Sequence, residues 1–356
     1  MKISIGTNIK QGPWGGGNLF AINLINYLKK NNHEVVNNLD DNDIDLILIT
    51  EPRKTSESSA FTHIEVMEYL TYIKSDTLVV HRINECDERK NTNFVNQYLI
   101  NANKISDHTV FVSTWIKNLY LNQGISKKNM SVILAGADRG IFNPENFQRW
   151  DSLGPLKIVT HHWGANWNKG FEIYQQLDKM LEDPEWKVKF EFQYIGNLPP
   201  KFKFNNSTHT KPLSGIDMAQ EIKKNHLYLT ASLNEPSGNH HIEAAQCGLP
   251  LLYINSGGIP EYCEGYGIEF NNLNFQEKLI EAFNSYEAIR DKVLHYKGDS
   301  DLMSKKYEEL FLKLLDNKKS VLSKRDTIYK GNKFRKNLFF LKRRIKSLKN
   351  AENNKN

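Results

Sequence analysis

One segment carries most of the structural information in this chain: Leu233-Asn-Glu-Pro-Ser-Gly-Asn-His-His-Ile-Glu-Ala-Ala-Gln-Cys-Gly-Leu-Pro250. It is typical of a polar loop that turns into a short helix. Pro236 can open a helix, because its missing N–H would lack an intrahelical partner there in any case. Ser237 or Asn239 could cap the helix with a side-chain oxygen, and Gly248 can end it.

The segment is flanked by two largely apolar runs, residues 226–231 and 249–254, which predict strands. The unit is therefore strand, loop, helix, strand. A helix start presents free backbone N–H groups and the positive end of the helix dipole, so it can bind a phosphate group. Two carboxylates, Glu235 and Glu243, stand on either side of this start.

The composition indicates two ordinary folded domains. The chain has 356 residues, of which 39% are hydrophobic and 11% aromatic. No stretch approaches the roughly 20 apolar residues of a membrane span, and residues 1–6 are typical of a first strand rather than a signal peptide. The three cysteines, Cys86, Cys247 and Cys263, lack metal-ligand spacing. We therefore expect a reduced, cytoplasmic setting without disulfides.

The positive charge is concentrated in the tail. From Lys318 to the C-terminus there are 14 Lys and Arg residues against two acidic ones, a net charge of +12; the whole chain carries +6, which leaves −6 for residues 1–317. Apolar residues recur there at helical spacing: Phe334, Leu338, Leu341, Ile345 and Leu348. Our first interpretation of residues 318–356 is a helix on an anionic membrane surface. A disordered tail ranks second and contact with nucleic acid third.

The first third of the chain alternates short apolar runs with helical patterns. The expected strands are residues 2–6, 34–36, 45–49, 77–81, 109–112 and 132–135. This alternation is the β-α-β rhythm of a parallel, doubly wound α/β sheet. A polar, turn-rich stretch over 136–156 separates it from a second series of the same kind.

From this pattern we divide the chain into four parts. We predict an N-terminal domain over 1–148 and a C-terminal domain over 149–300, both doubly wound. An amphipathic helix over 301–317 should pack on the body, and the basic tail over 318–356 completes the chain.

A glycine-rich loop, Gln11-Gly-Pro-Trp-Gly-Gly-Gly-Asn18, follows the first expected strand. Glycines let a backbone approach a ligand closely, and ligands bind beyond the carboxyl ends of such strands. We therefore favour a wall of a binding site that includes Gly15 and Gly16; a flexible surface turn is the alternative. The loop is not a Gly-x-Gly-x-x-Gly motif, so it gives little support to a nicotinamide site.

Three further stretches are rich in polar or charged residues. His81 and Arg82 stand at the carboxyl end of an expected strand, where binding sites form. The alternative is that His81 is a structural residue and that the charged residues around it form a solvated loop. Lys169 precedes an expected helix, where its ammonium group could pair with a diphosphate; a surface lysine is the alternative. The acidic run 40–45 precedes a strand, so we interpret it as a solvated turn rather than a metal site.

The residues around the opening segment resemble a known family. Glu235 and Glu243 form an E-x7-E element, which continues through residues 244–250 and through the small-residue loop 256–261. Residues 136–144 are similar to a hinge signature of the same family. These motifs resemble those of the retaining GT-B glycosyltransferases of family 4, the glycosyltransferase group 1 class. The resemblance implies a GT-B architecture, with two Rossmann-like domains facing a central cleft.

The resemblance also implies a sugar-nucleotide donor held by the second domain. The residue matching Glu243 binds the ribose hydroxyls, and the residue matching Glu235 contacts the donor sugar near its reacting end. Asn168-Lys-Gly170 resembles the phosphate-binding lysine of the family, so Lys169 would neutralise the leaving diphosphate. His81 would line the sugar pocket. Four residues would turn their backbone to the diphosphate or the sugar: Ser237, Gly238, Asn239 and His240.

One position departs from the family pattern. Trp163 stands where family members usually carry an arginine for the diphosphate. One of the two histidines at 161 and 162, or Arg82 from the opposing domain, could take its part. The Gly15-Gly16 backbone would close the donor site from the first domain.

The implied reaction is transfer of a hexose-type sugar, with retention and without a metal or cofactor. The acceptor would be a glycan, lipid or protein-linked group, as in synthesis of a surface polysaccharide, glycolipid or glycoprotein. One alternative is a sugar-nucleotide epimerase or phosphorylase of the same architecture, which product analysis with and without acceptor would separate. Another is a non-catalytic binding subunit, which failure to bind any sugar nucleotide would favour.

Overall fold

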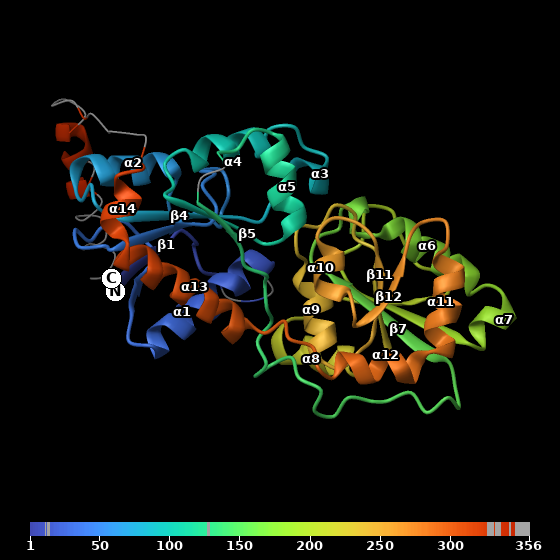
Figure 1. Ribbon diagram of the computed structural model, residues 1–356. Helices are drawn as coiled ribbons and strands as arrows, with labels where there is room; N and C mark the ends of the chain where they lie inside the picture. The colour runs from blue at the N-terminus through green and yellow to red at the C-terminus, as the bar shows by residue number, and fades with distance from the viewer. Residues whose placement is uncertain are drawn as a thin grey trace, which may run out of the picture.

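The computed structural model describes residues 1–10, 12, 15–126, 129–325, 331, 336–341 and 343–345. Within these residues the chain forms two parallel six-stranded sheets, each covered by helices, and the two units lie side by side (Figure 1). The prediction of an α/β fold with two doubly wound units is confirmed.

The first unit has the strand order β2-β1-β3-β4-β5-β6. Its strands are β1 (Lys2–Ile5), β2 (Glu34–Val36), β3 (Leu46–Ile49), β4 (Leu78–Ile83), β5 (His108–Phe111) and β6 (Met130–Val132). Its helices are α1 (Gly16–Lys30), α2 (His63–Tyr72), α3 (Asp87–Lys90), α4 (Val95–Asn103) and α5 (Thr114–Asn122). The strand order reverses beside β1, and a crevice is expected beyond the carboxyl ends of the strands there.

The second unit has the strand order β12-β11-β10-β7-β8-β9, with the reversal beside β7. Its strands are β7 (Leu156–His162), β8 (Phe190–Gly196), β9 (Thr208–Thr210), β10 (Leu227–Thr230), β11 (Leu251–Ile254) and β12 (Gly267–Phe270). Its helices are η1 (Trp167–Lys169), α6 (Phe171–Met180), α7 (Pro184–Lys187), α8 (Gly215–Ile222), α9 (Asn239–Gln246), α10 (Ile259–Cys263), α11 (Phe275–Asn284) and α12 (Tyr286–Val293).

The central strands are buried on both faces. Every residue of β3, β4 and β11 is buried. A parallel sheet covered on both sides needs continuous apolar runs rather than alternation, which is why these runs stand out in the sequence. β4 differs from the other two strands in composition, because it also buries the polar side chains of His81 and Arg82.

The chain returns to the first unit after it has completed the second. α13 (Ser300–Asp316) and α14 (Lys318–Leu322) lie against the first unit, with α13 beside α1 (Figure 1). Tyr307 of α13 packs edge-on against Phe20 of α1, and Phe311 packs against Tyr307. The last helices therefore complete the core of the first unit.

The two segments that cross between the units run together. Ala137, in the connection after β6, forms a parallel bridge with Asp299, just before α13. A Cβ added at Gly136 would lie 2.1 Å from the backbone of Asp299, so only glycine fits at this crossing. The boundary predicted at residue 148 lies in the connection between β6 and β7.

The basic tail starts against the first unit. The guanidinium of Arg325 pairs with the buried carboxylate of Asp107 at 2.6 Å. Residues 336–341 and 343–345 are helical. Two apolar positions of the expected tail helix, Phe334 and Leu348, lie outside the described residues. In the part of the chain that the structure describes, no helix has both the length and the apolar character needed to span a bilayer.

Candidate active site

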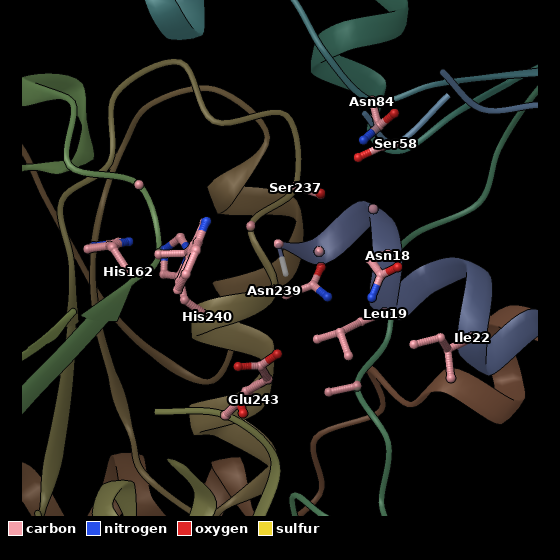
Figure 2. Close-up of a pocket in the computed structure, with 18 of the residues that line it drawn as sticks. Asn18, Leu19, Ile22, Ser58, Asn84, His162, Ser237, Asn239, His240 and Glu243 are labelled. Carbon is pink, nitrogen blue, oxygen red and sulfur yellow. The ribbon is translucent and has the colours of Figure 1, made fainter. Parts of the chain in front are cut away.

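A cavity of about 580 Å³ lies between the two units, with residues of both in its walls. Figure 2 shows side chains of α1 and α9 facing one another across it. Most residues singled out from the sequence line this cavity: Gly15, Gly16, Arg82, Lys169, Glu235, Ser237, Gly238, Asn239, His240 and Glu243.

Two helix N-termini meet in this cavity. α9 begins at Asn239 after Gly238, and α1 begins at Gly16. Neither helix has a side-chain cap or an acidic residue in its first turn. The prediction that Ser237 or Asn239 caps α9 is therefore wrong. The free N–H groups and the positive dipole ends of both helices remain available to an anion.

Two glycines lie where these helix starts meet. A Cβ at Gly16 would lie 2.9 Å from the side chain of Asn239, and a Cβ at Gly238 would lie 2.7 Å from the ring of His240. Gly238 also has a φ of 75°, which residues with a side chain rarely adopt. The glycine-rich loop therefore brings the backbone of the first unit against the start of α9.

Glu235 lies in the loop before α9, between two cations. Its Oε2 is 2.5 Å from the Nζ of Lys169, and its Oε1 is 3.1 Å from the Nε of Arg89. Lys169 belongs to η1 of the same unit, whereas Arg89 belongs to α3 of the opposite unit. Burial alone would raise the pKa of Glu235, but the charges of Arg89 and Lys169 outweigh it and hold the pKa at about 2. Glu235 is therefore an ionised carboxylate in a buried site.

Arg89 also approaches a second carboxylate. Its Nη1 donates to Glu85 at 3.2 Å, and the Nζ of Lys90 lies 2.9 Å from the same carboxylate. The sequence showed Arg89 only as one member of a charged run after β4. Its pairing with Glu235 depends on how the two units face each other, and no local pattern reveals that.

Glu243 lies one turn into α9 and faces the same cavity (Figure 2). Its Oε2 is 2.9 Å from the Nε2 of His161, and the Nδ1 of His161 is 3.1 Å from the hydroxyl of Tyr228. This chain of contacts orients the carboxylate. At 1.5 Å per residue, Glu243 stands about 6 Å along the helix axis from Asn239.

Four histidines lie close together: His161, His162 and His240 line the cavity, and His241 packs against His240. The ring centroids of His162 and His240 are 4.5 Å apart, and the Nε2 of His240 is 2.8 Å from the hydroxyl of Thr230. Burial lowers the pKa of His162 and of His240 well below the ordinary value. These two rings are therefore neutral at pH 7 and add no positive charge to the cavity.

The structure corrects the placement of His81. Successive residues of a strand point to opposite faces, and in β4 this turns His81 into the core, where its Nδ1 lies 3.0 Å from the amide oxygen of Asn103. Arg82 points the other way and lines the cavity, with its guanidinium carbon 3.8 Å from the centroid of Phe20. The expected role of His81 in the sugar pocket has no support in this position.

Trp163 lies at the cavity with 47% of its surface exposed and brings no charge. Among the described residues, no group of three or more His, Cys, Asp or Glu is arranged to hold a metal ion. The three cysteines are free and buried. Independence from metals stays a prediction.

No protein-family model matches the chain. Over 166 residues it is 25% identical to one subunit of the human phosphatidylinositol N-acetylglucosaminyltransferase. That stretch is 44% of this chain, and it spans about a third (33%) of the human protein.

Solved structures resemble the chain over most of its length. Anabaena HepE in complex with UDP-glucose has a TM-score of 0.65 at 14% identity, over 88% of this chain and 100% of that one. Sucrose-phosphate synthase from Thermosynechococcus elongatus has a TM-score of 0.59 at 14% identity, over 88% and 99%. The pneumococcal O-GlcNAc transferase GtfA with UDP and GlcNAc has a TM-score of 0.57 at 16% identity, over 82% and 59%. At these identities the likeness establishes the fold, which is GT-B.

We predict that the protein loses stability as the pH falls from 7 to 5. Burial lowers the pKa of His81 to about 4 and that of His241 to about 3. Below the ordinary value near 6.5, the unfolded chain therefore binds protons that the folded chain does not. Each such histidine lowers the free energy of unfolding by up to about 1.4 kcal/mol per pH unit.

Urea unfolding at pH 7, 6 and 5 measures this loss. His81→Gln removes one of these groups without changing the charge at pH 7, so its stability should fall less steeply than that of the wild type. A free energy of unfolding that stays flat or rises towards pH 5 would contradict the placement of these buried rings.

Proposed function

We propose that this protein is a glycosyltransferase that uses a nucleotide-diphosphate sugar as its donor. One observation carries the proposal: Glu235 and Glu243 flank an uncapped helix start that shares its cavity with Lys169. A nucleotide sugar presents its sugar, its diphosphate and its ribose in that order. A carboxylate, an anion-binding helix start and a second carboxylate suit these three parts. The names of the human relative and of the pneumococcal neighbour with bound UDP and GlcNAc describe sugar transferases, which supports the same function.

Each group has one task in this proposal. Glu243, oriented by His161, accepts hydrogen bonds from the ribose hydroxyls, and Glu235 contacts the sugar. The bond between the anomeric carbon and the phosphate oxygen breaks, while the acceptor hydroxyl forms the new bond to that carbon. The hydroxyl proton passes to the departing phosphate oxygen. Negative charge develops on the diphosphate, and the fixed N–H groups of α9 and the ammonium of Lys169 stabilise it.

Retention of configuration, transfer of a hexose-type sugar and independence from metals are parts of the same proposal. They rest on the resemblance of the E-x7-E element and of the residues around Lys169 to family 4. Trp163 departs from that family, and its missing charge makes the other cations of the cavity more important.

We propose that the acceptor is rich in hydroxyl groups and binds on the side of the first unit. That wall carries the uncharged amides of Asn23, Asn26 and Asn84, of which Asn84 is labelled in Figure 2. An amide can both donate and accept hydrogen bonds, which suits sugar hydroxyls. A glycan, or the sugar of a lipid-linked or protein-linked acceptor in polysaccharide, glycolipid or glycoprotein synthesis, has this chemistry.

We further propose that the protein works in the cytoplasm at an anionic membrane surface. Leu338, Leu341 and Ile345 are exposed on the helical part of the tail, which also carries Arg343 and Arg344. Apolar side chains of this kind can enter the lipid interface, and each nearby basic residue contributes about 1 kcal/mol at an anionic surface.

Isothermal titration calorimetry with UDP, GDP and ADP tests the donor site. We predict that the wild-type protein binds at least one of them and that Glu243→Gln weakens this binding about tenfold. The reason is that an uncharged amide is a weaker acceptor for ribose hydroxyls than a carboxylate. Glu264→Gln alters an exposed carboxylate outside the cavity and should bind as the wild type does.

Two outcomes would contradict this proposal, the first for the role of one residue and the second for the function as a whole. Equal affinity of Glu243→Gln and the wild type would remove Glu243 from the ribose site. Failure of the wild type to bind any of the three diphosphates would contradict the proposed function itself.

For the membrane proposal, we predict that removal of residues 326–356 releases the protein from anionic vesicles. The cut retains Arg325, because its pair with Asp107 belongs to the folded body. Co-sedimentation with phosphatidylserine-containing vesicles, and with phosphatidylcholine vesicles as the control, measures the effect. The full chain should bind the anionic vesicles and not the phosphatidylcholine vesicles, and this binding should weaken at high salt. Unchanged binding after truncation would contradict the proposal.

A further inference from the structure

α3 of the first unit is held against the loop that leads into α9. The side-chain amide of Asn168 donates to the carbonyl of Arg89 at 3.2 Å. The side-chain amide of Asn234 donates to the carbonyl of Glu88 at 3.3 Å. These contacts fix the backbone of α3 at the mouth of the cavity and carry the side chain of Arg89 towards Glu235 of the opposite unit.

The resulting cluster has more positive than negative charge. Its cations are Lys169, Arg89 and Lys90, and its carboxylates are Glu235 and Glu85. Three cations against two carboxylates leave a net charge of +1 beside the uncapped start of α9. An ionised carboxylate between Lys169 and Arg89 shows that an anionic oxygen is stable at this point between the two units.

Three other basic groups that line the cavity contact groups other than Glu235. Arg53 makes two hydrogen bonds to Glu51, at 2.7 and 2.6 Å. The guanidinium of Arg82 lies over the ring of Phe20, a residue of α1. His161 is bound to Glu243. Arg89 therefore stands out among the described cavity cations, because it reaches Glu235 from the opposite unit while Lys169 reaches it from its own.

We propose that Arg89 binds the diphosphate of the donor, as a second cation beside Lys169 that the opposite unit supplies. This inference rests on the proposed function and extends its donor site. When the donor enters, its diphosphate takes the place between Lys169 and Arg89 that the carboxylate of Glu235 occupies without it, and Glu235 turns to the sugar. The planar guanidinium matches two phosphate oxygens at once, which a lysine ammonium cannot do.

Lys169 and Arg89 belong to different units, so a diphosphate bound to both links the two units across the cavity.

The test compares the protein with Arg89→Ala, Arg89→Lys and Arg149→Ala. Calorimetry uses UDP, GDP and ADP, and the parent nucleoside of whichever diphosphate binds the wild type most tightly. Arg89→Ala should bind that diphosphate about 10- to 100-fold more weakly, the range for a lost charge-assisted contact. Its affinity for the parent nucleoside, which has no phosphate, should not change.

Two variants serve as controls. Arg89→Lys keeps the charge but not the planar fork, so it should recover part of the lost affinity. Arg149 is an exposed arginine paired with Glu287 outside the cavity, so Arg149→Ala should behave as the wild type. Arg89→Ala should fold, because Glu235 keeps Lys169 and Glu85 keeps Lys90 as partners; its thermal unfolding midpoint checks this.

The outcomes separate this inference from the proposed function. If Arg89→Ala binds the diphosphate as tightly as the wild type, while Lys169→Ala loses it, the assignment of Arg89 is overturned and the donor site stands. If Arg89→Ala loses nucleoside and diphosphate equally, Arg89 supports the site only structurally, and the assignment is overturned as well. If the wild type binds none of the three diphosphates, both the assignment and the proposed function fail.

Discussion

The arrangement of the cavity depends on one buried carboxylate. A carboxylate out of water is costly unless it is paired, and Glu235 is paired from two directions, by Lys169 of its own unit and by Arg89 of the other. The loop before α9, the end of η1 and the short helix α3 therefore all help to keep Glu235 ionised. This single contact links the placement of both units to the chemistry of the site.

The start of α9 supplies the second constraint. Gly238, at the N-cap position, has no side chain to cap the first turn of the helix, and Gly16 lets α1 approach it closely. Two positive helix ends then share a cavity with Lys169, and Glu243 lies one turn further along α9. The glycines, the helix ends and the cations all favour a bound anion, which suits the cavity to a phosphorylated ligand.

Local patterns predicted much of this architecture, but contacts between the units escaped them. The apolar runs of β3 and β11 indicated buried parallel strands, and the loop and helix around Glu235 and Glu243 stood out by their residues alone. The sequence could not show which side chains of β4 point to the cavity, because a strand buried on both faces lacks the alternation of apolar and polar residues that would reveal it. His81 was therefore expected at the site, but it lies in the core. Arg89 was missed because its partner belongs to the other unit.

The central claim is that Glu235 acts at the donor sugar in a transfer reaction. The most direct measurement is the rate at which nucleoside diphosphate is released from UDP-glucose, UDP-N-acetylglucosamine, GDP-mannose and ADP-glucose, with water as the acceptor of the sugar. Glu264→Gln is the matched control for Glu235→Gln. We predict turnover of at least one donor by the wild type and by the control. For Glu235→Gln we predict a loss of about 100- to 1,000-fold, the size found when a group that stabilises a transition state is removed. Undiminished turnover by a folded Glu235→Gln protein would contradict the role of Glu235 at the donor sugar.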